Sequence, residues 1–184
     1  MAIKFKEIKK YLSRVEKVSI CFEDGHYDNY MLPSDIPEGK YDELYIFGVG
    51  MADVEFPMDV YNEPKEFPQR ISLKEGFTLG CSLEIVVHEE PRDINREQEN
   101  VLTFGDLRNY LQIGRNFAIV TKEDWAEECY EWRHEISEDY DGMYVYGIGL
   151  VDNLDEIRKV THPCLLDSLM NKKMKIVLSE MPRD

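Results

Sequence analysis

Two glycine-rich stretches contain residue types from which nucleotide-binding sites are built. Residues 48–53 and 147–152 both read G-x-G-x-x-D. A dinucleotide-binding fingerprint needs a third glycine in place of the aspartate, and it must open a helix, which the following residues do not predict. We therefore interpret both stretches as strand ends that bulge or take a positive φ, with Gly50 at a positive φ and each aspartate capping a turn.

Cysteine and histidine offer a second kind of chemistry, which is metal binding. Cys129 and His134 lie five residues apart, and His162 and Cys164 flank a proline. Zinc sites use closer pairs such as C-x2-C, so the sequence predicts no metal and no other cofactor. A single asymmetric metal site stays open as an alternative. Four cysteines in a chain without a visible secretory signal indicate reduced thiols and a cytoplasmic protein.

Carboxylates supply the acids and bases of many enzymes. Asp42 and Asp53 recur as Asp141 and Asp152 at the same spacing. Their flanking residues are typical of turn caps rather than of two carboxylates that converge on a cleft with shifted pKa values. The chain also has neither a G-x-S-x-G elbow nor a Walker loop. The sequence therefore favours a protein that is not an enzyme.

Negative charge is the clearest functional hint. The formal net charge is −15, which disfavours direct binding to nucleic acid phosphates or anionic membranes and favours a basic protein surface as partner. Residues 23–66 hold twelve acidic residues against two basic ones, and residues 123–156 hold twelve against one. Tyrosine and tryptophan, which are enriched in interfaces, are interleaved with these acids. We expect partner contacts at Glu23, Asp24, Asp28, Tyr30, Glu127, Glu128, Glu131 and Trp132.

The elements that must position these residues occur twice in the chain. An offset of 99 aligns residues 5–53 with 104–152 without a gap, and an offset of 91 aligns residues 91–93 with 182–184. Such a fixed period indicates a tandem duplication. No cysteine or histidine is kept in both copies under this alignment, which pairs Cys21 with Val120, His26 with Trp125, Cys129 with Tyr30, and His134 with Asp35.

Each copy shows the pattern of one N-terminal helix and three strands. Helical spacing of apolar residues and apolar runs predict these elements at residues 4–14, 18–22, 44–49 and 83–88, and again at 104–112, 117–121, 143–148 and 174–178. Asp106 stands in capping-box register with Thr103 at the start of the second helix. Tyr45 and Tyr144 are predicted to be buried. Residues 53–80 read as irregular, and residues 163–171 as a helix.

These elements predict an α+β fold made of a tandem internal repeat. Each copy would be one N-terminal helix followed by a mainly antiparallel sheet, and the copies would form a pseudo-two-fold pair. The expected units are residues 1–93, a linker at 94–103, and residues 104–184. No apolar run approaches the ~20 residues that a membrane-spanning helix needs. The oligomeric state is left open, including a self-assembling unit.

The leading hypothesis is a non-enzymatic, acidic protein-binding module. Spaced carboxylates can stand in for phosphates, so the partner would be a basic nucleic-acid-binding protein, and the module would inhibit it. Inhibitors of restriction or CRISPR nucleases from phages and plasmids act in this way, and the analogy rests on size, charge and the missing catalytic signature. The alternative is a small-ligand or divalent-metal-dependent enzyme with its site in a crevice between the repeats.

Overall fold

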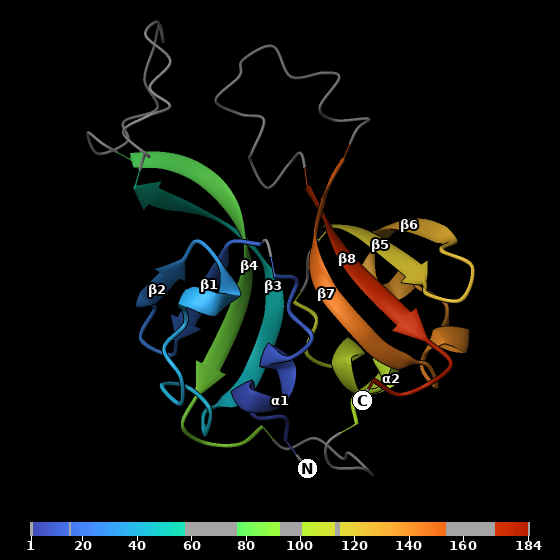
Figure 1. Ribbon diagram of the computed structural model, residues 1–184, viewed down its shortest axis with the longest axis horizontal. Coiled ribbons are helices and arrows are strands. Elements are labelled where there is room, and N and C mark those ends of the chain that lie inside the picture. Colours follow the sequence, from blue (N-terminus) through green and yellow to red (C-terminus); the bar gives the residue numbers. More distant parts are fainter. Residues whose placement is uncertain are drawn as a thin grey trace, which may run out of the picture.

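Two mixed four-stranded sheets lie side by side in the computed structural model (Figure 1). The structure describes residues 2–14, 16–57, 77–92, 101–112, 115–153 and 172–183. The first sheet has the strand order β2-β1-β4-β3, and its strands are β1 (Val18–Phe22), β2 (Tyr27–Tyr30), β3 (Tyr45–Pro57) and β4 (Phe77–His88). The second has the order β6-β5-β8-β7, and its strands are β5 (Arg115–Thr121), β6 (Glu127–Trp132), β7 (Tyr144–Asp152) and β8 (Lys172–Ser179).

The two sheets have the same pairing pattern, which is consistent with the internal repeat. In each sheet one pair of strands is parallel, β1 with β4 and β5 with β8, and the other two pairs are antiparallel. In the part of the chain that the structure describes, the helices are few and short. Two are α-helices, α1 (Phe5–Lys9) and α2 (Phe104–Arg108), and three are 3-10 turns, η1 (Pro33–Asp35), η2 (Arg133–Glu135) and η3 (Glu138–Tyr140). Both α-helices end earlier than the sequence predicts.

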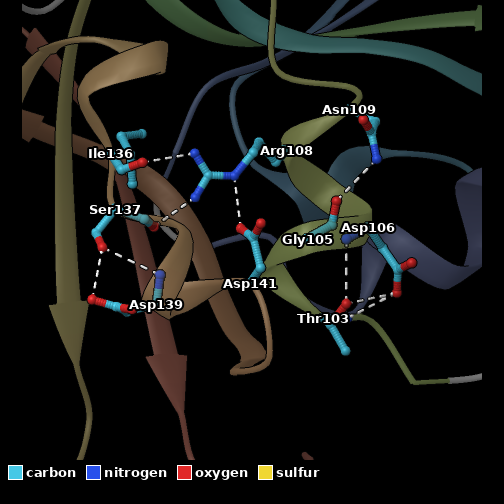
Figure 2. A network of polar contacts seen from close by, with 9 residues as sticks. All are labelled: Thr103, Gly105, Asp106, Arg108, Asn109, Ile136, Ser137, Asp139 and Asp141. Carbon is cyan, nitrogen blue, oxygen red and sulfur yellow. Dashed lines mark hydrogen bonds and ion pairs between the residues drawn. The ribbon is translucent and has the colours of Figure 1, made fainter.

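Each α-helix is held by a local signal at its start and by a few buried side chains. The predicted capping box of α2 is confirmed: the Asp106 amide donates to Thr103 Oγ1 at 3.2 Å, and the Thr103 amide donates to Asp106 Oδ2 at 3.2 Å (Figure 2). Phe5 and Ile8 of α1, and Phe104 and Leu107 of α2, are buried in the hydrophobic core. A five-residue helix depends on this packing, because isolated short helices are marginal in water.

The two halves of the chain are joined through the inner sheet edges. The segment after α1 pairs with β7: the Ile148 amide donates to Tyr11 O and the Ser13 amide donates to Ile148 O, both at 2.7 Å. The segment after α2 pairs with β3 in the same way, where the Val49 amide donates to Tyr110 O at 2.8 Å. The bridge partners Leu12 with Ile148 and Val49 with Leu111 are buried. Each half therefore places one isolated parallel bridge against the inner sheet edge of the other.

A pair of arginines strengthens this junction. Arg92 donates to the carbonyl oxygen of Phe47 at 3.1 Å and lies over the ring of Tyr110, 5.7 Å from its centroid. Arg183 donates to the carbonyl oxygen of Tyr146 at 2.8 Å and lies 5.9 Å from the ring centroid of Tyr11. The repeated Pro-Arg-Asp sequence thus supplies the same contact twice, an arginine from one half over a tyrosine from the other.

The structure corrects the interpretation of the glycines. The expected bulges are present, between Ile46 and Gly48 and between Val145 and Gly147. Gly50, however, does not have a positive φ, so that prediction is wrong. A Cβ at Gly50 would collide with Gln112, and one at Gly149 would lie 2.9 Å from Ser13 Cβ. Glycine is needed at these positions because the joining segment of the other half lies close against the strand there.

Other predictions need smaller corrections. Tyr45 and Tyr144 are only half-buried, whereas the buried tyrosines are Tyr11, Tyr41 and Tyr110. Strands β2 and β6 lie in acidic stretches where no strand was predicted, and β3 and β4 extend into the stretch interpreted as irregular. The predicted helix at 163–171 and most of the expected linker at 94–103 lie outside the described residues.

The ungapped alignment also fails in one place, at the outer hairpins. Asp24 and Asp124 each accept a hydrogen bond from the amide two residues later, and the next residues, Gly25 and Trp125, both have positive φ. Strand register then pairs Tyr30 with Val18 and Tyr130 with Phe117. The structure therefore matches Trp125 with Gly25 rather than His26, Cys129 with Asn29 rather than Tyr30, and His134 with Ser34 rather than Asp35.

Candidate functional site

The hairpin of β5 and β6, with the turns that follow it, displays a dense group of carboxylates. All eight acidic residues between positions 123 and 139 are exposed, and we call them the acidic face: Glu123, Asp124, Glu127, Glu128, Glu131, Glu135, Glu138 and Asp139. Strand β6 is the outermost strand of its sheet, at the far side from the junction (Figure 1). The acidic face is therefore presented at one end of the molecule.

Hydrogen bonds fix the carboxylates at the tip of this hairpin. Asp124 accepts from the Thr121 hydroxyl at 2.5 Å and from the Ala126 amide at 3.0 Å. Glu123 accepts from the Glu180 amide at 2.9 Å and from the Ser179 hydroxyl at 2.8 Å. The bond from Thr121 lowers the pKa of Asp124, and the bond from the Glu180 amide lowers the pKa of Glu123. Both groups are thus rigid and charged at neutral pH.

The two arginines nearest the acidic face bind carbonyl oxygens and Asp141 rather than the face itself. The Arg133 guanidinium donates to the carbonyl oxygen of Leu111 at 2.7 Å. Arg108 donates to Asp141 at 2.7 Å and to the carbonyl oxygens of Ile136 and Ser137 at 2.8 Å and 2.6 Å, which ties the acidic turns to α2 (Figure 2). Within the described residues, none of the eight carboxylates forms an ion pair with a lysine or arginine. The negative charge is therefore left for solvent or a partner.

Trp125 stands at the tip of the same hairpin. Its side chain is 64% exposed, and its φ is +57°, in the left-handed region that bulky residues rarely adopt. The matching residue in the first half is Gly25, for which this conformation carries no steric cost. Sequence reasoning counted Trp125 among the interleaved aromatics but did not select it. Comparison of Asp24-Gly25 with Asp124-Trp125 would have singled it out.

The outer hairpin of the first half is built differently. Asp28 accepts from Lys40 Nζ at 2.8 Å and from the Tyr41 hydroxyl, and the bond from Lys40 lowers its pKa. The Tyr30 and Tyr41 hydroxyls are 2.5 Å apart. In the second half, Tyr130 donates to Glu128 at 2.5 Å. Each end therefore has a carboxylate bonded to a tyrosine hydroxyl. Within the described residues, Asp28 also pairs with a lysine, whereas Glu128 does not.

The predicted contact residues fall into two separate groups. Glu23, Asp24, Asp28 and Tyr30 belong to the hairpin of β1 and β2, whereas Glu127, Glu128, Glu131 and Trp132 belong to β6. Because β2 and β6 are the strands of their sheets farthest from the junction, the two groups lie at opposite ends of the molecule (Figure 1). One flat partner surface cannot contact both groups at once.

The other candidate chemistries lack a supporting arrangement in the described residues. These residues contain no group of three or more His, Cys, Asp or Glu side chains placed to hold a metal ion. Asp152 pairs with Lys172 at 2.8 Å, and Cys129 accepts a hydrogen bond from Lys173 at 3.2 Å. Asp141 anchors Arg108. His162 and Cys164 lie outside the described residues.

Comparisons with known proteins identify no relative. No protein-family model matches the chain, and neither does any curated protein sequence or solved structure. In the described residues, no helix is long and apolar enough to cross a lipid bilayer. Function therefore has to be inferred from the chemistry of the surface.

Proposed function

We propose that the protein is a non-enzymatic, acidic protein-binding module that acts in the cytoplasm on a basic partner. Its framework would be a duplicated unit of helix and sheet, with the two copies related by a pseudo-two-fold axis at the inner edges. Such a framework is rigid, because each copy covers the sheet edge of the other, and it holds an outer hairpin at each end of the molecule.

The acidic face on the second hairpin is the observation that carries this proposal. Its carboxylates are exposed, and those at the tip are fixed by hydrogen bonds. Attraction between such a surface and a basic partner speeds their association and favours positively charged partners over negatively charged ones. Rigid carboxylates at a protein surface can also occupy the sites that phosphates use. The partner would thus be a basic nucleic-acid-binding protein, and binding would inhibit it by competing with nucleic acid.

A salt-dependent capture experiment tests this function. Immobilised protein should retain a basic nucleic-acid-binding protein from lysate at low salt and release it at high salt, since exposed charges are screened. The captured protein, once purified, should lose bound duplex DNA when the module is added. A partner that binds equally at both salt concentrations, or that keeps its DNA, would contradict the proposal.

Variants locate the binding surface. The triple change Glu127→Gln, Glu128→Gln and Glu131→Gln removes three charges from the acidic face and should weaken capture by about tenfold or more. The matched control is Glu89→Gln with Glu90→Gln, at exposed positions after β4, which should have little effect. A larger loss in the control would place the binding surface elsewhere.

The enzyme alternative has a different test. A cation site between the copies should raise the melting temperature with one divalent ion, and Asp152→Asn should abolish that shift. At the level of Val49 and Ile148 the junction is filled by buried side chains and backbone pairing. We therefore expect no shift with magnesium, calcium, manganese or zinc.

A further inference from the structure

The inner and outer sheet edges of this molecule differ in what covers them. The inner strands β3 and β7 each receive a short parallel segment from the other half, through Leu111 and Leu12 respectively. The outer strands β2 and β6 end their sheets. An uncovered strand edge exposes backbone N–H and C=O groups that can pair with another extended chain. At the inner edges, extended segments already pair with the strand backbone through isolated parallel bridges.

We propose that β6 binds an extended, lysine- or arginine-rich segment of the partner as an added β-strand. This inference rests on the proposed function and specifies how the acidic face engages its partner. Main-chain hydrogen bonds would supply affinity, and the side chains of β6 would supply selectivity. Glu127, Glu128 and Glu131 are all exposed on this strand, so a basic segment matches the edge in charge, and a second acidic edge is repelled.

The register of β6 shows which backbone groups face outward. The Thr121 amide donates to Ala126 O, so residues 121 and 126 form a hydrogen-bonded pair. Bonding alternates along antiparallel strands, so Glu128 and Tyr130 direct their backbone groups toward β5, and Glu127, Cys129 and Glu131 direct theirs outward. The outward amide of Glu131 donates to Glu135 Oε2 at 3.0 Å. Among the described residues no acceptor is recorded for the amides of Glu127 and Cys129, so these two are the donors available to an added strand.

Strand β2 is the less suitable edge. It has four residues, against six in β6. Its carboxylate, Asp28, is already paired with Lys40, whereas the carboxylates of β6 have no such partner within the described residues. A basic segment would have to displace Lys40 to reach Asp28. We therefore assign the added strand to β6.

A single proline separates edge pairing from charge attraction. Cys129→Pro removes one outward N–H and changes no charge, and proline is tolerated on an edge strand when its N–H position faces solvent. The control Cys129→Ala removes the thiol and its contact with Lys173 but keeps the N–H. The probe is a synthetic peptide of alternating lysine and valine, about seven residues long, which matches an ordinary strand. We expect Cys129→Pro to weaken peptide binding at least tenfold and Cys129→Ala to leave it unchanged.

Each outcome has one meaning. If Cys129→Pro binds the peptide with wild-type affinity, the edge pairing is overturned but the charge-based function is not. If Cys129→Pro and Cys129→Ala lose affinity equally, the effect belongs to the thiol, and the edge pairing is again overturned. Loss of the wild-type interaction in the triple glutamine variant tests the proposed function separately. If Cys129→Pro does not fold, the same peptide with alternate residues N-methylated is the decisive probe. It keeps every charge, and binding equal to that of the unmethylated peptide would refute strand addition.

Amide hydrogen exchange supplies an independent readout. The outward amides of Glu127 and Cys129 should exchange more slowly when the peptide is bound, by tenfold or more, because an added strand would accept from them. The inward amides of Glu128 and Tyr130 should change little. Equal protection of inward and outward amides, or none, would exclude strand addition at β6.

Discussion

The two outer hairpins share an aspartate followed by a residue of positive φ in their turns, but they differ in how their carboxylates are paired. In the first hairpin, Asp28 is paired with Lys40, and nearby Glu43 is paired with Lys4 and Lys6. In the second, the ungapped sequence alignment places Asp139 opposite Lys40 and Gly142 opposite Glu43. Two carboxylates of the first end thus have lysine partners, whereas within the described residues none of the acidic face has one. If the proposed function is correct, this difference favours the second end as the binding surface.

The largest expected effects concern what the two halves share. Phe5 and Phe104 are equivalent and both fully buried, so Phe5→Ala and Phe104→Ala should each reduce the free energy of unfolding by about 3–5 kcal/mol. Chemical denaturation measures both. Because the halves cover each other's sheet edges, each variant should shift a single common transition. A transition that splits in two would mean that the halves fold independently.

Adding a methyl group at the glycines of the junction should have a smaller effect on the free energy of unfolding, about 1–3 kcal/mol, and the effect should differ between the two halves. Gly149→Ala would place a methyl group 2.9 Å from Ser13 Cβ, which is attached directly to backbone, whereas Gly50→Ala meets the flexible side chain of Gln112. We expect Gly149→Ala to be the more destabilising change in urea denaturation. Gln112→Ala should restore most of the stability lost in Gly50→Ala. No rescue would show that the close approach of Gln112 is not the cause.

Reintroducing the missing cation should make the second hairpin resemble the first. Asp139→Lys introduces an ammonium group at the residue that the ungapped alignment pairs with Lys40, and we expect it to pair with Glu128. Affinity for the lysine–valine peptide should fall by about tenfold, because the change both removes and neutralises negative charge. Calorimetric titration measures the affinity, with Asp139→Asn as the control that should lose less. Unchanged affinity in Asp139→Lys would remove Glu128 from the binding surface.

A further small effect on stability should come from the residue of positive φ at the tip of each hairpin. Trp125→Gly relieves a left-handed conformation and should raise the free energy of unfolding by about 1 kcal/mol. The reciprocal change Gly25→Ala should lower it by a similar amount. Thermal unfolding measures both variants. If Trp125→Gly is instead destabilising, the indole makes contacts that outweigh the backbone strain.

The smallest effect should appear in the pH dependence of the first half. Hydrogen bonds from Lys4 and Lys6 lower the pKa of Glu43 from its ordinary value of 4.5 to about 2. The folded state therefore gains stability from this carboxylate above pH 4.5 and loses it as the pH falls toward 2. Glu43→Gln should melt slightly below wild type at pH 7, and the difference should disappear near pH 2. A difference that persists at pH 2 would have another origin.

Sequence reasoning found the elements that have strong local signals. Apolar runs placed β3, β4, β7 and β8, although β3 and β7 prove to be edge strands of their sheets and the ends of β3 and β4 were missed. The Thr103–Asp106 capping box located the start of α2. Strands β2 and β6 were missed because they lie at sheet edges, where polar residues are tolerated on both faces and no apolar pattern is required.

The errors at the candidate site have a non-local cause. Gly50 was assigned a positive φ because only its neighbours in sequence were considered, whereas the constraint comes from Gln112 in the other half. One residue inserted in the turn before Asp124 shifted the alignment and concealed the match of Trp125 with Gly25. The acidic residues were identified from composition, but their division between opposite ends depends on strand order, which composition does not contain.

The mutual pairing of the two halves at their inner sheet edges has a consequence for the history of the chain. A single ancestral unit would have exposed the inner edge that is now covered, and it could cover that edge only by meeting a second copy of itself. Fusing two copies in one polypeptide makes the encounter intramolecular, so that assembly no longer depends on concentration. It also ends the requirement that both copies be identical. The two hairpins could then diverge, so that one now has Asp28 paired with Lys40 and the other has Trp125 at its tip.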